Sequence, residues 1–333
     1  MSLINLPLRY KEFLKILRSL LRGKKYYAYS FYQSIQKSSR NRECFSLLEN
    51  SKLAIVVQGP YLEKENFTLE TLRMYRRNFP ESIIILSTWT LPKCDESALN
   101  QIGVKVSLNE RPIDAGVSNV NLQIASTKSG MLLAMELGVN HVLKTRTDQR
   151  IYNPNFYAYL TSLLDAFPLA KPCSDQHSRL IACSLNTFKV RMYGISDMFL
   201  FGHVEDMVRY WDVPLDDRNS DGVDKAKTWR EHANLQLSEV YFCTTYLRSI
   251  GKDVKFTLKS SLSAIAENFI VIDQHSISLF WNKYTYDENR YDHGFYNSQL
   301  TFNDWLILYS CQDNIVYDEK SLDLKISEVI KEY

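Results

Sequence analysis

From residue 52 onward, short apolar runs alternate with longer stretches in which apolar residues recur every three or four positions. The short runs are rich in β-branched residues and predict strands at 53–57, 82–89, 104–108 and 141–147. The longer stretches predict helices at 66–79, 95–102 and 119–137. This alternation predicts an α/β fold with a central, mostly parallel sheet flanked by helices.

Helix-breaking residues stand where the predicted helices should stop. Pro80 follows the first helix, and Gly103 and Gly138 follow the second and third. Proline cannot continue a helix, and glycine is the usual residue just past a helix end. These positions support the predicted boundaries.

The fourth predicted strand ends in a cluster of charges, because Asp148 stands among Lys144, Arg146 and Arg150. In open parallel sheets, ligands bind beyond the carboxyl ends of the strands. A carboxylate bracketed by cations at such an end suits an anionic ligand, such as a phosphate, with its divalent metal. The alternative is a turn in which Asp148 pairs with Arg146 or Arg150, and the composition favours neither.

Positive charge is concentrated at the N-terminus. Residues 1–45 hold an excess of about eight positive charges, so the remainder carries about −6, given the net charge of +2. Phe13, Ile16, Leu17 and Leu20 recur at helical spacing among lysines and arginines. We therefore expect a basic amphipathic segment over 1–50, which either lies on an anionic membrane or packs on the protein. Nucleic acid is a weaker expectation because the rest of the chain is acidic.

The rest of the chain reads as one domain over 52–310, followed by a tail over 311–333 that is predicted to end in a helix. No apolar run is long enough to span a membrane, and no secretory signal is visible. Six scattered cysteines form no Cys-x-x-Cys pair. These features favour a cytoplasmic protein.

Several nucleotide and hydrolase signatures are missing. The sequence holds no Gly-x-Gly-x-x-Gly fingerprint, no Gly-Lys-Ser/Thr loop and no Gly-x-Ser-x-Gly elbow. The six histidines show no metal-binding spacing, so a dedicated zinc site is not expected.

Six ordered blocks between residues 52 and 280 resemble the WavE family of lipopolysaccharide-synthesis proteins. The blocks are "IVVQGP", "TLETLRMYRRNFPESIIILSTW", "NVNLQIASTKSGMLLA", "VLKTRTDQRIY", "SDMFLFG" and "LSEVYF". The resemblance implies a nucleotide-sugar-dependent glycosyltransferase of bacterial surface polysaccharide, either lipopolysaccharide or capsule. It also implies a GT-A-like, Rossmann-type fold in which an Asp-x-Asp motif ends a central strand and helps to hold metal and donor diphosphate.

Carried over to this chain, the last Asp of that motif is Asp148, whereas Arg146 stands at the first position. The resemblance leaves two arrangements open. Either Asp148 binds Mg²⁺ or Mn²⁺ with the diphosphate and His275, or no metal binds. In the second arrangement Arg146, Lys144 or Arg150 neutralises the leaving group. The alternative for His275 is an ordinary surface or core histidine without a role in the site.

The resemblance also places the donor's nucleotide at the ends of the first two strands. Gln58 and Gly59 match the loop that receives the base and ribose, with Thr88 nearby. Trp89 would stack on the base, or alternatively would pack in the core.

The third predicted helix opens with an unusually polar stretch. Asn121 and Lys128 would approach the donor sugar or its phosphates, because a helix N-terminus attracts anions. Helix capping and a solvated helix face are equally good interpretations of each residue alone.

A carboxylate is needed to take the proton of the acceptor hydroxyl, and Glu239 in "LSEVYF" is our candidate for this catalytic base. The alternative is a first-turn Glu that stabilises the helix dipole. Asp197 in "SDMFLFG" is the candidate for binding the acceptor or donor hydroxyls, or else caps a turn. The aromatic and polar segment 280–299 would form an acceptor platform or a loop-rich surface.

The sequence thus predicts a peripheral glycosyltransferase on the inner face of the cell membrane, with a nucleotide-sugar donor and a lipid-linked or polysaccharide acceptor. Two alternatives stay open. One is a transferase that moves a sugar phosphate or alditol phosphate from a nucleotide carrier. The other is a non-catalytic, membrane-associated partner in polysaccharide assembly, favoured if Arg146 makes the donor site inactive.

Overall fold

The computed structural model describes residues 52–170, 175–218, 226–282, 299–311 and 314–326. These residues belong to one compact unit that runs from residue 38 to residue 333. The basic segment expected over 1–50 lies outside the described residues. Its expected contact with a membrane therefore stays a prediction.

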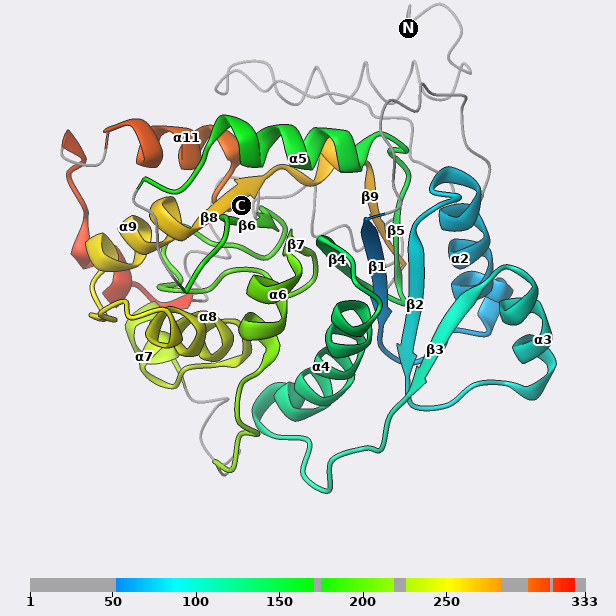
Figure 1. Ribbon diagram of the computed structural model, residues 1–333. Helices are drawn as coiled ribbons and strands as arrows, with labels where there is room; N and C mark the ends of the chain where they lie inside the picture. Colours follow the sequence, from blue (N-terminus) through cyan, green and yellow to red (C-terminus); the bar gives the residue numbers. More distant parts are fainter. Residues whose placement is uncertain (1–51, 171–174, 219–225, 283–298, 312–313, 327–333) are drawn as a thin grey trace, which may run out of the picture. The chain divides into compact units, whose positions relative to one another are not determined.

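A seven-stranded sheet with the order β3-β2-β1-β4-β7-β6-β8 forms the centre of the unit (Figure 1). Its strands are β1 Leu53–Gln58, β2 Ile83–Thr88, β3 Val104–Leu108, β4 His141–Arg146, β6 Leu180–Cys183, β7 Leu200–His203 and β8 Phe269–Ile272. β7 runs antiparallel to both of its neighbours, and the other neighbouring pairs are parallel. The expected α/β class, with a mostly parallel sheet, is confirmed.

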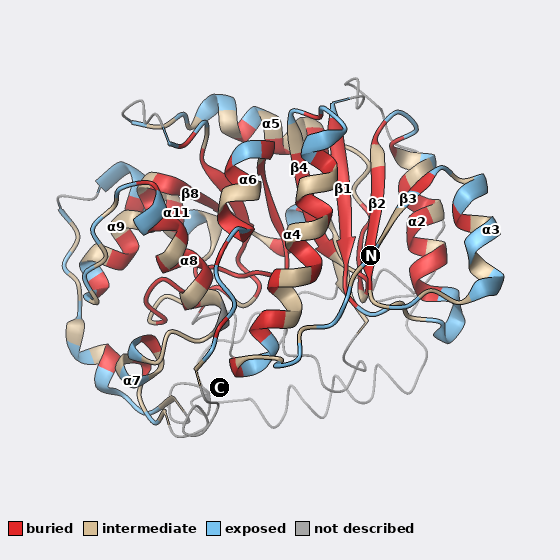
Figure 2. Ribbon diagram, turned by 60° about the horizontal axis from the view of Figure 1, so that its bottom comes forward, coloured by how far each residue is buried: buried red, intermediate tan, exposed pale blue. Residues whose placement is uncertain are grey.

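The central strands are apolar on both faces because helices cover both faces. Every residue of β1 is buried, and Figure 2 shows the central strands almost wholly in the buried colour. The sequence run 53–57 is accordingly apolar throughout, without the alternation of a half-exposed strand.

The helices are α2 Phe67–Asn78, α3 Lys93–Gln101, α4 Val120–Glu136, α5 Phe156–Ala166, α6 Val204–Trp211, α7 Trp229–Asn234, α8 Ser238–Ser249, α9 Leu258–Asn268 and α11 Phe302–Cys311. Gly103 and Gly138 adopt positive φ angles of 66° and 71° just past α3 and α4, as expected for helix ends. The predicted helices and strands of residues 52–147 are thus all present.

Successive strands are added on opposite sides of β1, which makes the carboxyl ends of β1 and β4 a topological switch point. The connections β1 to β2 and β2 to β3 move outward on one side, whereas the connection β3 to β4 returns across the sheet. Right-handed crossovers then place α2 and α4 on opposite faces, as Figure 1 shows. Open sheets of this kind bind ligands at such a point.

Aromatic side chains support the half of the sheet beyond β4. Trp211 of α6 packs on Phe242 of α8, with ring centroids 4.8 Å apart. Trp305 of α11 donates a hydrogen bond of 2.8 Å to the carbonyl of Phe269 in β8. These contacts fix β7, β6 and β8. They also fix the segments that connect these strands at the edge of the sheet where β1 and β4 end.

The tail was expected to end in a helix, and its residues 327–333 lie outside the described residues. Glu319–Asp323 forms a 3₁₀ helix, because the Asp318 side chain accepts a hydrogen bond from the amide of Lys320 and caps it. Lys325 then forms a β-bridge with Thr228. The part of the tail that the structure describes therefore packs on the domain, and a boundary at residue 310 would fall inside α11.

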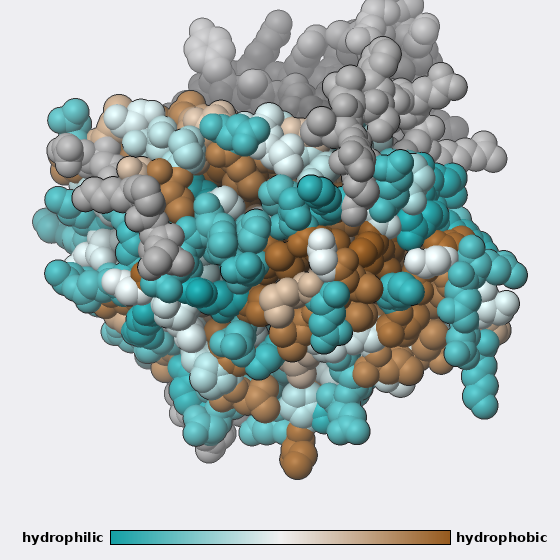
Figure 3. Space-filling view, viewed as in Figure 1, coloured by the Kyte–Doolittle hydropathy of each residue, from teal (hydrophilic) through white to brown (hydrophobic). Residues whose placement is uncertain are grey.

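The surface beside α4 is markedly apolar. Figure 3 shows hydrophobic residues gathered over the region of β2 and β3, whereas hydrophilic residues dominate the rest of this face.

Within the described ranges, no helix is both long enough and apolar enough to cross a bilayer.

Candidate active site

The loops that follow β1 and β4 meet at the switch point. The amide of Thr147 donates a 3.0 Å hydrogen bond to the carbonyl of Gln58. Gly59 has a φ angle of 131°, and a Cβ atom there would lie 2.8 Å from Oγ1 of Thr147. Only glycine fits this close approach, so Gly59 allows the two loops to meet.

Gln58 is held in a buried polar network. Its Nε2 atom donates a 2.7 Å hydrogen bond to Oγ of Ser126 in α4. Ser87, at the end of β2, donates to the carbonyl of Ser126 and accepts from the side chain of Asn109. Gln58 and Ser87 thus fix the strand ends against α4.

Trp89 stands just beyond β2 and is partly exposed. The guanidinium of Arg111 lies over its ring, 5.9 Å from the centroid. Trp89 is therefore not a fully buried core residue, and it stands at the end of β2. Thr88 is fully buried and contributes backbone rather than side chain to this edge.

Arg146 and Asp148 form an ion pair at the end of β4. The Nε and Nη2 atoms of Arg146 donate hydrogen bonds of 2.8 and 2.9 Å to the two carboxylate oxygens. Trp281 of β9 (Leu279–Trp281) donates a third, of 2.9 Å, to Oδ2 of Asp148. Burial alone would raise the pKa of Asp148, but the hydrogen bonds and charge of Arg146 and the indole outweigh it and lower the pKa.

The residues at this motif do not fit a divalent metal held in the manner of an Asp-x-Asp pair. Both oxygens of Asp148 accept hydrogen bonds, and a cation stands at the position of the first carboxylate. Within the described part of the chain, no three His, Cys, Asp or Glu side chains gather around a common point. A hard cation such as Mg²⁺ needs several oxygen ligands, and they are not assembled here.

His275 does not join Asp148, contrary to the metal pair expected from the resemblance. The antiparallel ladder of β5 (Gln149–Ile151) with β9 separates them. Asp148 lies at one end, where its carbonyl accepts from the amide of Asn282. His275 lies beyond the other end, in an exposed 3₁₀ turn.

Lys144 and Asp197 are buried beside the ion pair, and the partly buried Glu239 lies close enough for its charge to act on Asp197. Nζ of Lys144 donates a hydrogen bond to the carbonyl of Asp197 and lies over the ring of Trp211. β7 runs antiparallel to β4, so Asp197, three residues before Leu200, comes to the same sheet edge as Arg146.

Burial shifts the pKa of Asp197 and that of Lys144. It raises the pKa of Asp197, which is 4% exposed; Lys144 opposes this shift and the neighbouring Glu239 adds to it. Burial lowers the pKa of Lys144 to about 8, against the attraction of Asp197. Two carboxylates at one sheet edge, one of them with a raised pKa, are typical of acid–base sites.

Glu239 lies in the first turn of α8, so part of the alternative interpretation is correct. It is held by two residues that the sequence analysis missed. Asn186 donates a 2.6 Å hydrogen bond to its Oε1 atom, and Nη1 of Arg191 lies 3.5 Å from the same oxygen. Asn186 stands shortly after the buried strand β6. A polar residue near the end of a buried strand is the signal that singled out Gln58 and Asp148, and the same signal would have indicated Asn186.

The loop 184–197 that carries Asn186 and Arg191 is tightly built. Nη2 of Arg191 donates hydrogen bonds to the carbonyls of Asn186 and Gly194. A Cβ atom at Gly194 would lie 2.2 to 2.8 Å from the Arg191 side chain. Asn186 and Tyr193 adopt positive φ angles of 66° and 56°, and such backbone strain is common at functional sites.

Three predicted donor-binding residues lie elsewhere. Asn121 is buried, and its amide bonds the backbone of Asp114 and Asp216, so it joins two loops. Arg150 is buried against α2, where it bonds Thr71 and the carbonyl of Phe67.

Lys128, the third of them, pairs with a residue at the end of another helix. It forms a surface ion pair of 2.5 Å with Asp212 at the end of α6. It stands eight residues into α4, so it is more than two helical turns from the N-terminus that was expected to attract anions.

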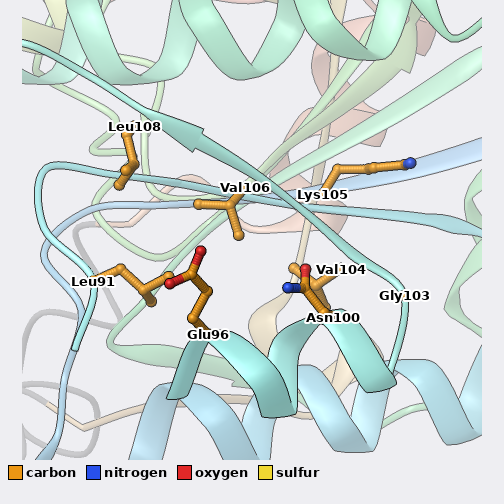
Figure 4. A pocket seen from close by; sticks show the side chains of 8 residues that line it. All are labelled: Leu91, Glu96, Asn100, Gly103, Val104, Lys105, Val106 and Leu108. Carbon is orange, nitrogen blue, oxygen red and sulfur yellow. The ribbon is translucent and has the colours of Figure 1, made fainter. Parts of the chain in front are cut away.

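A separate cavity of about 480 Å³ lies along β3, the outer strand of the sheet. Figure 4 shows Glu96 and Asn100 of α3 facing the side chains of β3 across it. Its lining residues are Leu91, Glu96, Asn100, Gly103, Val104, Lys105, Val106 and Leu108. It contains none of the candidate site residues, and β1 and β2 lie between β3 and β4.

The fold and the charged sheet edge define an α/β protein with a candidate ligand site at its switch point. The model of the family described as WavE lipopolysaccharide synthesis matches residues 53–331. The chain therefore belongs to the WavE family, and its role lies in polysaccharide synthesis.

Other comparisons add little. A search of curated proteins finds no match. A solved structure described as mannose-1-phosphate geranyltransferase from Thermus thermophilus is similar over 57% of this chain and 67% of that chain. The sequence identity is 11% and the TM-score is 0.28, so this likeness carries no inference about the chain.

Proposed function

We propose that the chain is a nucleotide-sugar-dependent glycosyltransferase of bacterial surface polysaccharide synthesis. The observation that carries the proposal is the pair of carboxylates, Asp197 and Glu239, set among Lys144, Arg146 and Arg191 at the carboxyl edge of the sheet. Carboxylates serve proton transfer, and cations serve a phosphate leaving group. Membership of a lipopolysaccharide-synthesis family supports a sugar as the group transferred.

In the proposed reaction, Glu239 takes the proton of an acceptor hydroxyl. The hydroxyl oxygen forms a bond to the anomeric carbon of the donor sugar, and the bond from that carbon to the phosphate oxygen breaks. The electron pair leaves with the nucleotide, whose added negative charge Arg146 stabilises. A single displacement of this kind inverts the anomeric configuration.

The surroundings of the two carboxylates support different roles. Oε1 of Glu239 is held by Asn186 and Arg191, which orients the side chain as a positioned base requires. Asp197 has a raised pKa because it is buried, and we propose that it binds the acceptor hydroxyls. The partly exposed ring of Trp89 supports binding of the nucleotide base at the end of β2.

The experiment is a transfer assay with UDP-, GDP-, CMP- and dTDP-sugars and a lipid-linked glycan acceptor. Glu239→Gln should lower the rate by roughly 100-fold or more, because a positioned base typically contributes this much. Glu231→Gln is the matched control, since Glu231 only accepts backbone hydrogen bonds in the capping box of α7. Urea unfolding should show that both variants remain folded.

Phosphorus NMR of the product separates glycosyl transfer from sugar-phosphate transfer, because only the latter leaves a phosphodiester in the product. A phosphodiester would replace the proposed reaction with phosphotransfer. Full activity of Glu239→Gln would remove Glu239 from the mechanism. Failure to use any donor would favour a non-catalytic role in polysaccharide assembly.

A further inference from the structure

We infer that the donor phosphates bind without a divalent metal, on a guanidinium of Arg146 that Asp148 and Trp281 hold in place. The inference rests on the proposed function, because it concerns the donor of that reaction. It assigns Trp281 as a positioning residue and gives Asp148 a structural task in place of metal binding.

The carboxylate of Asp148 already accepts three hydrogen bonds. Arg146 bonds both of its oxygens, and the indole of Trp281 bonds one of them again. A metal would have to compete with this fork and approach the positive charge of Arg146. The arrangement therefore favours an anion at this sheet edge over a cation.

The three residues come from two distant parts of the chain that pair as strands. Gln149 of β5 stands opposite Trp281 of β9, and the amide of Asn282 donates a 2.8 Å hydrogen bond to the carbonyl of Asp148. The guanidinium of Arg146 also lies over the indole ring, 5.8 Å from its centroid. The guanidinium of Arg146 is thus held at its edge by Asp148 and at its face by the indole. It therefore loses little conformational entropy when a phosphate binds.

Arg146 remains accessible although its partners are largely buried. Its side chain is 28% exposed, whereas that of Asp148 is 16% exposed. Lys144 is fully buried beneath this edge, so it contributes positive potential but no direct contact with a ligand. An arginine fork suits phosphate oxygens better than the point charge of a lysine.

The experiment measures binding of UDP, GDP, CDP, CMP and dTDP by calorimetry, each in excess EDTA and in Mg²⁺ or Mn²⁺. At least one nucleotide should bind with the same affinity in EDTA and in metal. Arg146→Gln should weaken that binding by about tenfold or more in both conditions, because charge-assisted hydrogen bonds are lost. Arg146→Lys should recover only part of the affinity, since the charge returns without the fork.

Arg230→Gln is the matched control. Arg230 forms an equivalent fork with Asp323 on the surface, with hydrogen bonds of 2.7 and 3.2 Å, so its loss should leave nucleotide affinity unchanged. Urea unfolding should show that both variants remain folded, whereas the inference expects lost binding only in Arg146→Gln.

The outcomes separate the inference from the proposed function. Binding that EDTA abolishes and Mn²⁺ restores would overturn the metal-free site and leave the transferase proposal standing. Binding in EDTA that survives Arg146→Gln would overturn the assignment of Arg146. The absence of nucleotide binding under every condition would overturn both.

Discussion

Two arginine–aspartate pairs in this molecule have almost the same geometry and very different surroundings. Arg218 bonds both oxygens of Asp216 at 2.7 and 2.9 Å, and Arg146 bonds those of Asp148 at 2.8 and 2.9 Å. In each pair the two residues are two positions apart. Local sequence therefore explains the pairing in both places and cannot by itself say which pair is functional.

An aromatic ring completes each pair. The guanidinium of Arg218 lies 5.4 Å from the ring centroid of Tyr241, much as that of Arg146 lies over Trp281. The hydroxyl of Tyr241, however, donates to the carbonyl of Pro214, whereas the indole of Trp281 donates to the paired aspartate. Only the second ring reinforces the ion pair itself.

The remaining partners distinguish the two pairs. Arg218 also donates to the carbonyls of Leu235 and Gln236 and so ties the loop 216–218 to the end of α7. Arg146 stands instead at the switch point, where its charge acts on Lys144 and Asp197. The same arginine–aspartate pair therefore ties a loop to a helix in one place and forms part of a candidate ligand site in the other. Its position in the fold decides between the two roles.

Exchanging the arginines for glutamine should separate the two roles, and this is the largest expected effect. Arg218→Gln leaves Asp216, which is 1% exposed, without its countercharge and should cost about 2 to 3 kcal/mol of unfolding free energy. The nucleotide affinity of Arg218→Gln should stay unchanged. Arg146→Gln should lose binding with a smaller loss of stability; urea unfolding and calorimetry on both variants measure this. The reverse pattern would exchange the two assignments.

The buried lysine behind Arg146 predicts a pH effect that the other pair lacks. The pKa of Lys144 falls from the ordinary value of 10.5 to about 8, so between these values the unfolded chain binds more protons than the folded chain. Stability should therefore rise with pH in this window, and the cost of burying the charge is fully present below pH 8. Relative to Lys144→Met, the wild type should gain about 1 kcal/mol from pH 7.5 to 9 in urea unfolding. A constant difference between the two proteins would contradict the lowered pKa.

Removing one hydrogen bond beside each pair should give the smallest effects. Trp281→Phe keeps a ring but not the donor to Asp148, and nucleotide affinity should fall by about threefold to tenfold. Tyr241→Phe loses the bond to Pro214 and should cost about 1 kcal/mol of stability without a change in affinity. Equal affinities in both variants would show that Trp281 does not position Arg146.

The sequence allowed the first four strands and their helices to be predicted because each depends on local apolar spacing and on breakers such as Gly103. The position of Asp148 at a strand end followed for the same reason. The roles of Asn121 and Arg150 could not be predicted, because their partners, the backbone of Asp216 and the side chain of Thr71, are distant in the sequence. Trp281 was missed likewise, since only the pairing of β5 with β9 brings it to Asp148.

The most direct test of the account is a crystal structure of the protein with the nucleotide that binds most tightly. We expect the phosphates of the nucleotide within hydrogen-bond distance of Arg146 and its base beside Trp89. We expect no metal between the phosphates and Asp148. Phosphates held by a metal on Asp148, or a nucleotide in the cavity along β3, would contradict the account.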